Sequence, residues 1–255
     1  MMKNIFRYIL LVLLLIVAFP QNAHLQMLQG IVGGGSAAAV CTTPSTGNIH
    51  NEGFEGTGFD SGGVGGAWNL NESGTMDNDY SCPGTVLTGG CLQCLRANVA
   101  AGNAYSLLTL TTETDKTYTH TIVVQFYIAS IALDGYSTFS IVILDDHLSN
   151  KIGYVKLYCD QAAQCTSATN LFIRFNTGSG GTSTQAISLA TWHTLTIILT
   201  SGTAGTIKVD NGDAVNITKG DYGLKLLQIG EALGCGAGEA LDISYAYMYV
   251  NAVAP

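Results

Sequence analysis

The segment 192–215 constrains the fold of this chain more than any other part of the sequence. It reads WHTLTIILTSGTAGTIKVDNGDAV. Two runs rich in Thr, Ile, Leu and Val flank a glycine-containing turn, and Asn211-Gly212 is typical of a tight hairpin turn. We therefore predict two antiparallel strands in this segment, with a second tight turn after them.

The rest of the chain contains further short runs of Val, Ile, Thr, Tyr and Phe, separated by Gly, Asn, Asp or Ser. Outside the N-terminal segment, no stretch keeps a helical period over three turns. Many short strands separated by turn residues favour a β-sandwich or barrel. Asp77-Asn78-Asp79 is expected to form an Asx turn before the next strand. The predicted strands are 118–131, 136–144, 152–158, 170–176, 192–200, 206–210, 224–229 and 241–250.

Several short motifs, in their order along the chain, resemble one known superfamily. Trp192-His193, followed by Val209-Asp210 and Gly212, is similar to the hairpin of laminin G-like domains in the concanavalin A-like lectin/glucanase superfamily. The segments 51–56 (NEGFEG), 227–230 (LQIG) and 241–245 (LDISY) resemble other strands of that superfamily. The resemblance covers about 49–250 and implies an all-β fold, an antiparallel two-sheet β-sandwich of the concanavalin A-like jelly-roll type.

The composition bears on both partners and surroundings. Charged residues make up 11% of the chain, glycine occurs 31 times, and the formal net charge is −8. An acidic surface repels phosphate backbones, so we expect no nucleic-acid partner. A surface of Thr, Ser, Asn and Gly instead suits an extracellular β protein.

The N-terminus has the features of a secretion signal. Lys3 and Arg7 precede an apolar run at 8–19, which is short for a membrane span and fits a signal peptide. We expect a signal peptide or N-terminal anchor at 1–23, a flexible Gly/Ala-rich linker at 24–47, and the jelly-roll domain at 48–255. The protein is then secreted or displayed at the cell surface, with membrane contact only through an uncleaved N-terminal segment.

The seven cysteines are expected to form disulfides in an exported protein. Cys159 and Cys165 bracket a short connection between two predicted strands, so we predict that they pair. Cys82 can reach Cys91 or Cys94, and of these our prediction names Cys91. The odd count leaves at least one thiol free or intermolecular.

Strand alternation defines a candidate binding face, because side chains at every second position point away from the core. Glycan recognition uses aromatic rings together with hydrogen-bonding side chains on a rigid sheet. The alternative is an ordinary solvated sheet face with cross-strand pairs. Trp192 and His193 are interpreted as packing residues at the start of a strand. The predicted carbohydrate-binding residues are Gln125, Tyr127, Tyr154, Lys156, Tyr158, Arg174 and Asn176.

A catalytic pair of carboxylates is not evident. Retaining glycosidases need two carboxyl groups about 5 Å apart, whereas Glu52 and Glu55 are three positions apart and point to opposite faces of a strand. Asp145-Asp146-His147 is interpreted as a hairpin turn. The resemblance also implies a structural calcium ion near Glu52 or Glu55 and Asp242.

These features favour a non-catalytic extracellular module that binds carbohydrate or serves in adhesion. The expected partner is a glycan or cell-surface polysaccharide, and homo-oligomers are possible. One alternative is a structural subunit of an extracellular filament, sheath or virion. A second alternative is a divergent glycosidase.

Overall fold

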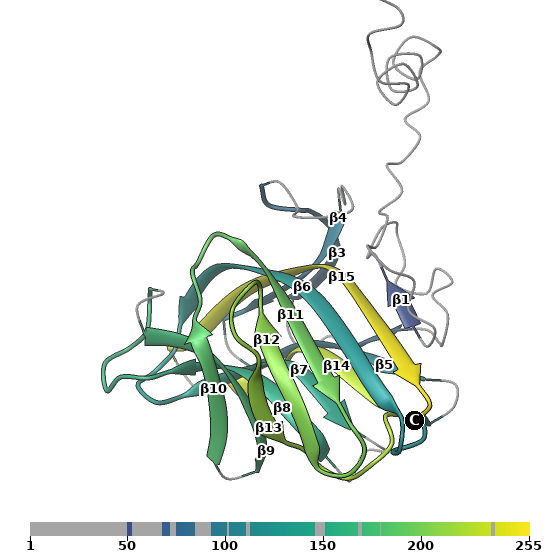
Figure 1. The fold of residues 1–255 in the computed structure, drawn as a ribbon. Helices are drawn as coiled ribbons and strands as arrows, with labels where there is room; N and C mark the ends of the chain where they lie inside the picture. The colour runs from purple at the N-terminus through teal and green to yellow at the C-terminus, as the bar shows by residue number, and fades with distance from the viewer. Residues whose placement is uncertain are drawn as a thin grey trace, which may run out of the picture. The chain divides into compact units, whose positions relative to one another are not determined.

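The chain folds into an antiparallel two-sheet β-sandwich, as the sequence predicts. The computed structural model describes residues 50–52, 68–71, 75–84, 93–100, 102–110, 113–145, 151–167, 170–178, 180–235 and 238–255. In this part of the chain the regular structure consists of strands that form two hydrogen-bonded sheets, stacked as two layers (Figure 1).

Sheet A has the strand order β13-β12-β11-β6-β15-β4-β3, and β1 also pairs with β15. The two longest strands, β6 and β15, lie side by side at its centre, with pairs from Ala240↔Ala132 to Val253↔Thr119. The strands of sheet A are β1 (His50–Glu52), β3 (Thr75–Ser81), β4 (Gln93–Val99), β6 (Thr119–Ala132), β11 (Trp192–Leu199), β12 (Ala204–Val209), β13 (Val215–Thr218) and β15 (Ala240–Val253).

Sheet B has the strand order β10-β9-β8-β7-β14-β5-β2. Its strands are β2 (Trp68–Asn71), β5 (Gly102–Thr109), β7 (Thr138–Asp145), β8 (Lys151–Cys159), β9 (Leu171–Gly178), β10 (Gly180–Ala186) and β14 (Leu226–Cys235). Consecutive strands β7, β8, β9 and β10 pair as neighbours, whereas β14 is inserted between β5 and β7 from far along the sequence.

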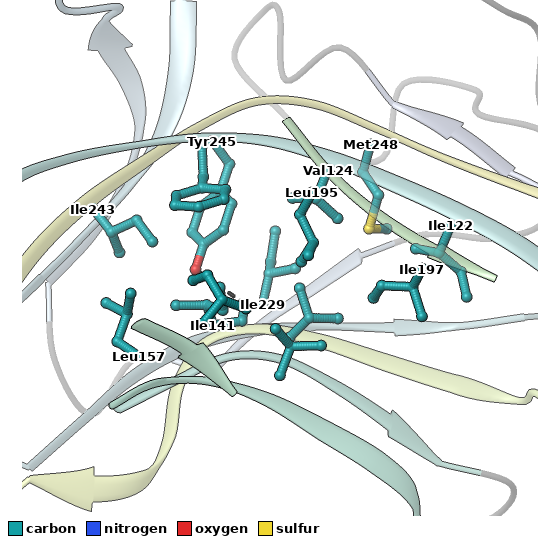
Figure 2. Close-up of a cluster of buried hydrophobic side chains, with 14 of the residues drawn as sticks. Ile122, Val124, Ile141, Leu157, Leu195, Ile197, Ile229, Ile243, Tyr245 and Met248 are labelled. Carbon is teal, nitrogen blue, oxygen red and sulfur yellow. Dashed lines mark hydrogen bonds between the residues drawn. The ribbon is translucent and has the colours of Figure 1, made fainter. Parts of the chain in front are cut away.

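The core lies between the sheets and is built from the inward side chains of both. Ile122, Val124 and Phe126 on β6 are fully buried and alternate with outward residues, as the period of a strand requires. Figure 2 shows Tyr245 of β15 reaching from sheet A toward Ile141 and Ile229 of sheet B. Its hydroxyl accepts a hydrogen bond from the Gly230 N–H at 3.0 Å and donates one to the Ile141 carbonyl at 3.1 Å.

The predicted strands from residue 118 onward are confirmed, although β14 ends six residues later than predicted and β10 and β13 were not predicted. The Asn-Gly turn is also present: the Gly212 N–H bonds to the Val209 carbonyl at 3.0 Å, and β12 pairs with β13 beyond it. One local prediction is wrong. Asp77-Asn78-Asp79 lies inside β3, where a register shift against β4 between Asp77 and Tyr80 accommodates the polar run without a turn.

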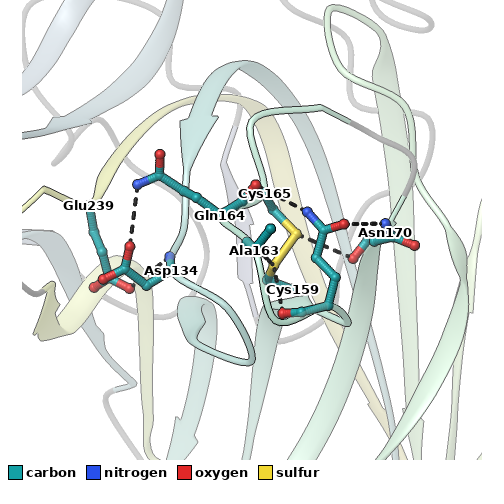
Figure 3. Close-up of a disulfide and its surroundings, with 8 residues drawn as sticks. Asp134, Cys159, Ala163, Gln164, Cys165, Asn170 and Glu239 are labelled. Atoms are coloured by element: carbon teal, nitrogen blue, oxygen red, sulfur yellow. Dashed lines mark hydrogen bonds between the residues drawn. A yellow bond between two sulfur atoms is a disulfide. The ribbon is translucent and has the colours of Figure 1, made fainter.

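One predicted disulfide is confirmed and the other is corrected. Cys159 and Cys165 are bonded and close the connection between β8 and β9, where the backbone of Cys165 also pairs with that of Leu133 (Figure 3). Cys82 is bonded to Cys94, not to Cys91. Tyr80 of β3 lies opposite Cys94 of β4, and Cys82, two residues beyond Tyr80, is expected on the same face as Cys94. Cys91 lies outside the described residues.

The predicted leader (1–23) and linker (24–47) also lie outside the described residues. Within the part of the chain that the structure describes, no helix has both the length and the apolar character needed to cross a membrane.

Candidate functional site

The outer face of sheet B brings together five of the seven predicted carbohydrate-binding residues. On β8, Val155 and Leu157 point into the core while the alternate side chains point outward. The register places Tyr154 opposite Asn176, Lys156 opposite Arg174, and Tyr158 opposite Phe172. We call Tyr154, Lys156, Tyr158, Arg174 and Asn176 the β8–β9 surface.

Cations and tyrosine rings pair within the β8–β9 surface. The Arg174 guanidinium carbon lies 3.3 Å from the centre of the Tyr158 ring, and the Lys156 ammonium lies 5.1 Å from the centre of the Tyr154 ring. Both distances are within the range of cation–π attraction. The two cations are therefore held side by side on neighbouring strands, in a protein whose net charge is −8.

A buried carboxylate, Glu231, lies next to this surface where β7 and β14 separate. The ladder between these strands ends at Ile229↔Val142. Beyond it the Ser140 N–H donates a hydrogen bond of 2.6 Å to Glu231 Oε2, so a side chain takes the place of a backbone acceptor. Glu231 is 1% exposed. Ser140 is the direct cross-strand partner of Lys156, which places the carboxylate beside the β8–β9 surface.

Burial lowers the pKa of Lys156 below its ordinary value, and the negative charge of Glu231 opposes part of that effect. A lysine in this position gives up its proton more readily than one in water. Sequence reasoning missed Glu231, although a signal was present. Leu227, Ile229 and Glu231 continue one alternating set along β14, so a carboxylate occupies a position where the pattern predicts a buried side chain.

A second buried carboxylate, Asp145, lies too far away to act with Glu231. Asp145 pairs with Lys151 at the end of β7 and is opposite Leu226 of β14. Glu231 lies five residues further along β14, which corresponds to about 16 Å. The carboxyl pairs of glycosidases are separated by about 5–9.5 Å. Asp146 and His147, the rest of the predicted turn, lie outside the described residues.

The other two predicted carbohydrate-binding residues, Gln125 and Tyr127, lie on β6 in sheet A. The predicted set is thus divided between the outer faces of two sheets. Gln125 is completely buried, between Thr194 and Tyr247 on the neighbouring strands, and neither atom of its amide has a hydrogen-bond partner. Tyr127 packs against Trp192, with ring centres 5.3 Å apart.

Glu52 and Asp242, two of the residues proposed for calcium, lie far apart on β15 and its partner. Arg96 holds both carboxylate oxygens of Asp242, at 2.8 and 2.6 Å. Glu52 pairs with Met248, six residues from Asp242 along β15, or about 20 Å. Glu55 lies outside the described residues, among which no cluster of three or more His, Cys, Asp or Glu side chains could hold a metal ion. Calcium binding itself stays a prediction.

Comparison with known proteins gives similar folds but no family. No protein-family model matches the chain, and no curated protein matches it. One similar solved structure is a Trypanosoma rangeli sialidase in complex with sialic acid, with a TM-score of 0.49 and 13% identity. The match covers 84% of this chain and 33% of the sialidase, so this chain spans about a third of that enzyme. For another structure named sialidase the TM-score is 0.47 and the identity is 10%, over 72% of this chain and 16% of that one.

Alginate lyases are also similar in structure. The marine PL7 alginate lyase AlyA1 from Zobellia galactanivorans has a TM-score of 0.45 and 14% identity, over 71% of this chain and 85% of the lyase. Alginate lyase A1-II′ of family 7 has a TM-score of 0.46 and 12% identity, over 65% of this chain and 79% of the lyase. The expectation of a non-catalytic binding or adhesion module is not supported by these neighbours, which are named as sialidases and alginate lyases.

Proposed function

We propose that this protein is a carbohydrate-active enzyme that acts on an acidic polysaccharide at the β8–β9 surface. The observation that carries the proposal is the placement of Lys156 directly opposite Arg174, with a tyrosine ring against each cation. Two adjacent cations on an acidic protein suit a ligand that carries carboxylates, and tyrosine rings suit the apolar faces of sugars. A uronate-containing chain combines both features.

The chemistry that fits these groups is β-elimination. The buried carboxylates Glu231 and Asp145 are separated by about 16 Å along the sheet, too far to act as the carboxyl pair of a glycosidase. Elimination requires a cation that neutralises the uronate carboxylate and a base that removes the proton from the adjacent carbon. The planar guanidinium of Arg174 matches a carboxylate in shape and charge. Lys156, whose pKa is lowered by burial, is the proposed base.

In this mechanism the neutral Lys156 amine takes the proton from the carbon next to the carboxylate. The electrons of the broken C–H bond form a carbon–carbon double bond, and the glycosidic C–O bond breaks toward the departing sugar, whose oxygen takes a proton from solvent. The carboxylate of Glu231, whose charge raises the pKa of Lys156, favours the ammonium that forms. The products are an unsaturated sugar end and a new reducing end.

The test is a panel of alginate, polygalacturonate, hyaluronan and the neutral glucan laminarin, assayed for reducing ends and for the ultraviolet absorbance of unsaturated uronate. We expect both signals with at least one uronate polymer and neither with laminarin. Arg174→Ala and Lys156→Gln should each lower kcat/KM about 100-fold or more, as loss of a catalytic acid–base group does. Lys208→Gln, on β12 of sheet A, is the matched control and should leave the rate unchanged.

Reducing ends without ultraviolet absorbance would exclude elimination. No product from any polymer, or full activity in both β8–β9 variants, would overturn the proposal.

Two finer assignments belong to the same proposal. We place the chain in the laminin G-like subgroup of the fold, on the Trp192-His193 and Val209-Asp210 hairpin. We also propose an extracellular location, on the basis of two disulfides and the signal-like N-terminus, because disulfides persist in oxidising compartments.

A further inference from the structure

Three side chains from separate segments form a hydrogen-bonded chain at one end of sheet A. His193 Nδ1 lies 2.7 Å from Asp210 Oδ2, and His193 Nε2 lies 3.2 Å from the hydroxyl oxygen of Ser188. These are the distances expected between a positioning carboxylate and its imidazole, and between a base and a hydroxyl nucleophile. Such an arrangement is recognised by geometry and roles, whatever the order of the residues in the sequence.

The fold holds the carboxylate firmly. Asp210 follows directly after β12, with a positive φ of 51°, and its N–H bonds to the Thr194 carbonyl at 2.8 Å. Its second oxygen, Oδ1, accepts the Thr194 N–H at 2.7 Å. Both carboxylate oxygens therefore have donors, and Oδ2 faces His193. The backbone of neighbouring β11 thus fixes the group that orients the imidazole.

The imidazole is buried and its ring is supported from one side. His193 is 5% exposed, and its ring centre lies 5.6 Å from that of Phe126. The hydrogen bond to Asp210 Oδ2 assigns the Nδ1 proton, which leaves Nε2 directed at Ser188. Nε2 also lies 3.0 Å from the Ser188 carbonyl, an acceptor that it can donate to when protonated.

Ser188 is exposed, in the loop between β10 and β11. A sharp turn brings it back over His193, because Ala190 has a positive φ of 53° and its N–H bonds to the Ile128 carbonyl at 2.9 Å. The N–H of Leu189, the residue after Ser188, makes no backbone hydrogen bond in the described part of the chain. An N–H directly after a nucleophile is a common donor to the oxyanion of acyl transfer.

We propose that Ser188, His193 and Asp210 form a second active site, which hydrolyses small carboxylic esters. Ser188 Oγ attacks the ester carbonyl carbon while His193 Nε2 takes the hydroxyl proton, and the imidazolium returns that proton to the departing alcohol. Water, deprotonated by the same imidazole, then attacks the acyl-serine, releases the carboxylic acid and restores Ser188. Asp210 is a positioning residue that holds the imidazole through Nδ1 and takes no proton in either step.

A purely structural role accounts for only part of this arrangement. The buried contacts of His193 with Phe126 and Asp210 pack the start of β11 and the turn after β12. These packing contacts do not require a hydroxyl at position 188, the exposed end of the hydrogen-bonded series. Ser188 therefore separates the two roles, since its removal leaves the packing contacts of His193 intact.

The test uses the full chain with p-nitrophenyl acetate as substrate and a fluorophosphonate as covalent probe. We expect hydrolysis with saturation and one phosphonyl group per molecule, on Ser188 and with loss of fluoride. Ser188→Ala should abolish labelling and lower kcat about 1,000-fold or more, as removal of a triad member does. Ser201→Ala, at an exposed turn between β11 and β12, is the matched control and should behave as the unchanged protein.

The positioning role of Asp210 has its own readout. Asp210→Asn should lower kcat with little change in KM, and Asp210→Glu should recover part of the loss, provided that both variants keep the unfolding midpoint of the unchanged protein. Absence of hydrolysis and labelling, or full activity in a folded Ser188→Ala variant, would overturn the proposal. Neither outcome affects the β8–β9 surface, which lies on the other sheet and is assayed with polysaccharides.

Discussion

Each of the two sheets carries a buried polar side chain, and the two side chains differ in whether their polar atoms have hydrogen-bond partners. On sheet A, the amide of Gln125 is fully buried and neither of its polar atoms has a partner. On sheet B, the carboxylate of Glu231 is 1% exposed, accepts the Ser140 N–H and lies near Lys156. A buried polar group stabilises a fold only when it is satisfied, so burial alone does not indicate what a residue contributes.

The surroundings of these two residues explain the difference. Gln125 lies between Thr194 and Tyr247, and Tyr247 belongs to a small cluster with Cys94, Val123, Trp192 and Ala246, against which Cys82 also packs. Pro83, next to Cys82, accepts the Trp192 indole N–H at 2.8 Å, so this segment contacts β11 as well as β4. Glu231 instead replaces a backbone acceptor between two strands that have separated.

The largest expected effect comes from removing the satisfied group. Glu231→Leu leaves the Ser140 N–H without its acceptor and takes the opposing charge away from Lys156. We expect a loss of about 2–3 kcal/mol in the free energy of unfolding, as for a buried hydrogen bond to a charged group. Denaturant unfolding measures it, with Glu113→Leu at an exposed position as control. Equal stability would mean that Glu231 is dispensable to the fold.

The next largest expected effect is an increase in the free energy of unfolding. Gln125→Leu replaces an unpartnered buried amide by an apolar side chain of similar size. Removing the cost of burying an unsatisfied group should raise the free energy of unfolding by about 1–2 kcal/mol. The same unfolding experiment measures it. A lower free energy of unfolding would show that the Gln125 amide is hydrogen-bonded in solution. The contrast between Gln125 and Glu231 would then disappear.

Sequence patterns predicted most strands but did not predict which outward side chains lie on the same sheet, and the reason is physical. Alternation and turn residues are local, so the limits of β8 and β11 could be read from a few neighbouring side chains. Alternation also tells which side of a strand faces the core. It does not tell which sheet the strand joins, because that depends on partners far along the chain, such as β15 for β6. Gln125 and Tyr127 were therefore grouped with residues of the other sheet.

The candidate site was found in part for the same reason. The five residues of the β8–β9 surface follow from the alternation within two adjacent strands, although the same alternation also places Phe172, opposite Tyr158, on this face. Glu231 depends on the separation of β7 from β14, where the Tyr245 hydroxyl from sheet A bonds to both strands. The hydrogen-bonded arrangement of Ser188, His193 and Asp210 depends on the turn at Ala190. The turn at Ala190 leaves no periodic signal in the sequence, whereas Glu231 is visible only as a carboxylate at a core position of the β14 alternation.

The smallest expected effect is a pH dependence that belongs to sheet B alone. Because burial lowers the pKa of Lys156, the unfolded chain binds more protons than the folded one between that lowered value and the ordinary value of 10.5. Stability then rises with pH across this window. The free energy of unfolding of Lys156→Met should not rise with pH in this window. The variant should therefore be more stable than the unchanged protein by the largest margin at neutral pH, and this margin should shrink toward pH 10.5. Lys156→Arg, which keeps its charge throughout, should also lack the rise.

Glu231→Leu sharpens this measurement. Without the carboxylate the pKa of Lys156 falls further, because the charge that opposed desolvation is gone. The window in which stability rises with pH should then begin at a lower pH than in the unchanged protein. Denaturant unfolding at intervals from pH 7 to pH 10.5 follows both curves. Parallel curves for the unchanged protein and Lys156→Met would contradict the coupling, and with it the role of Lys156 as a base that burial makes ready to accept a proton.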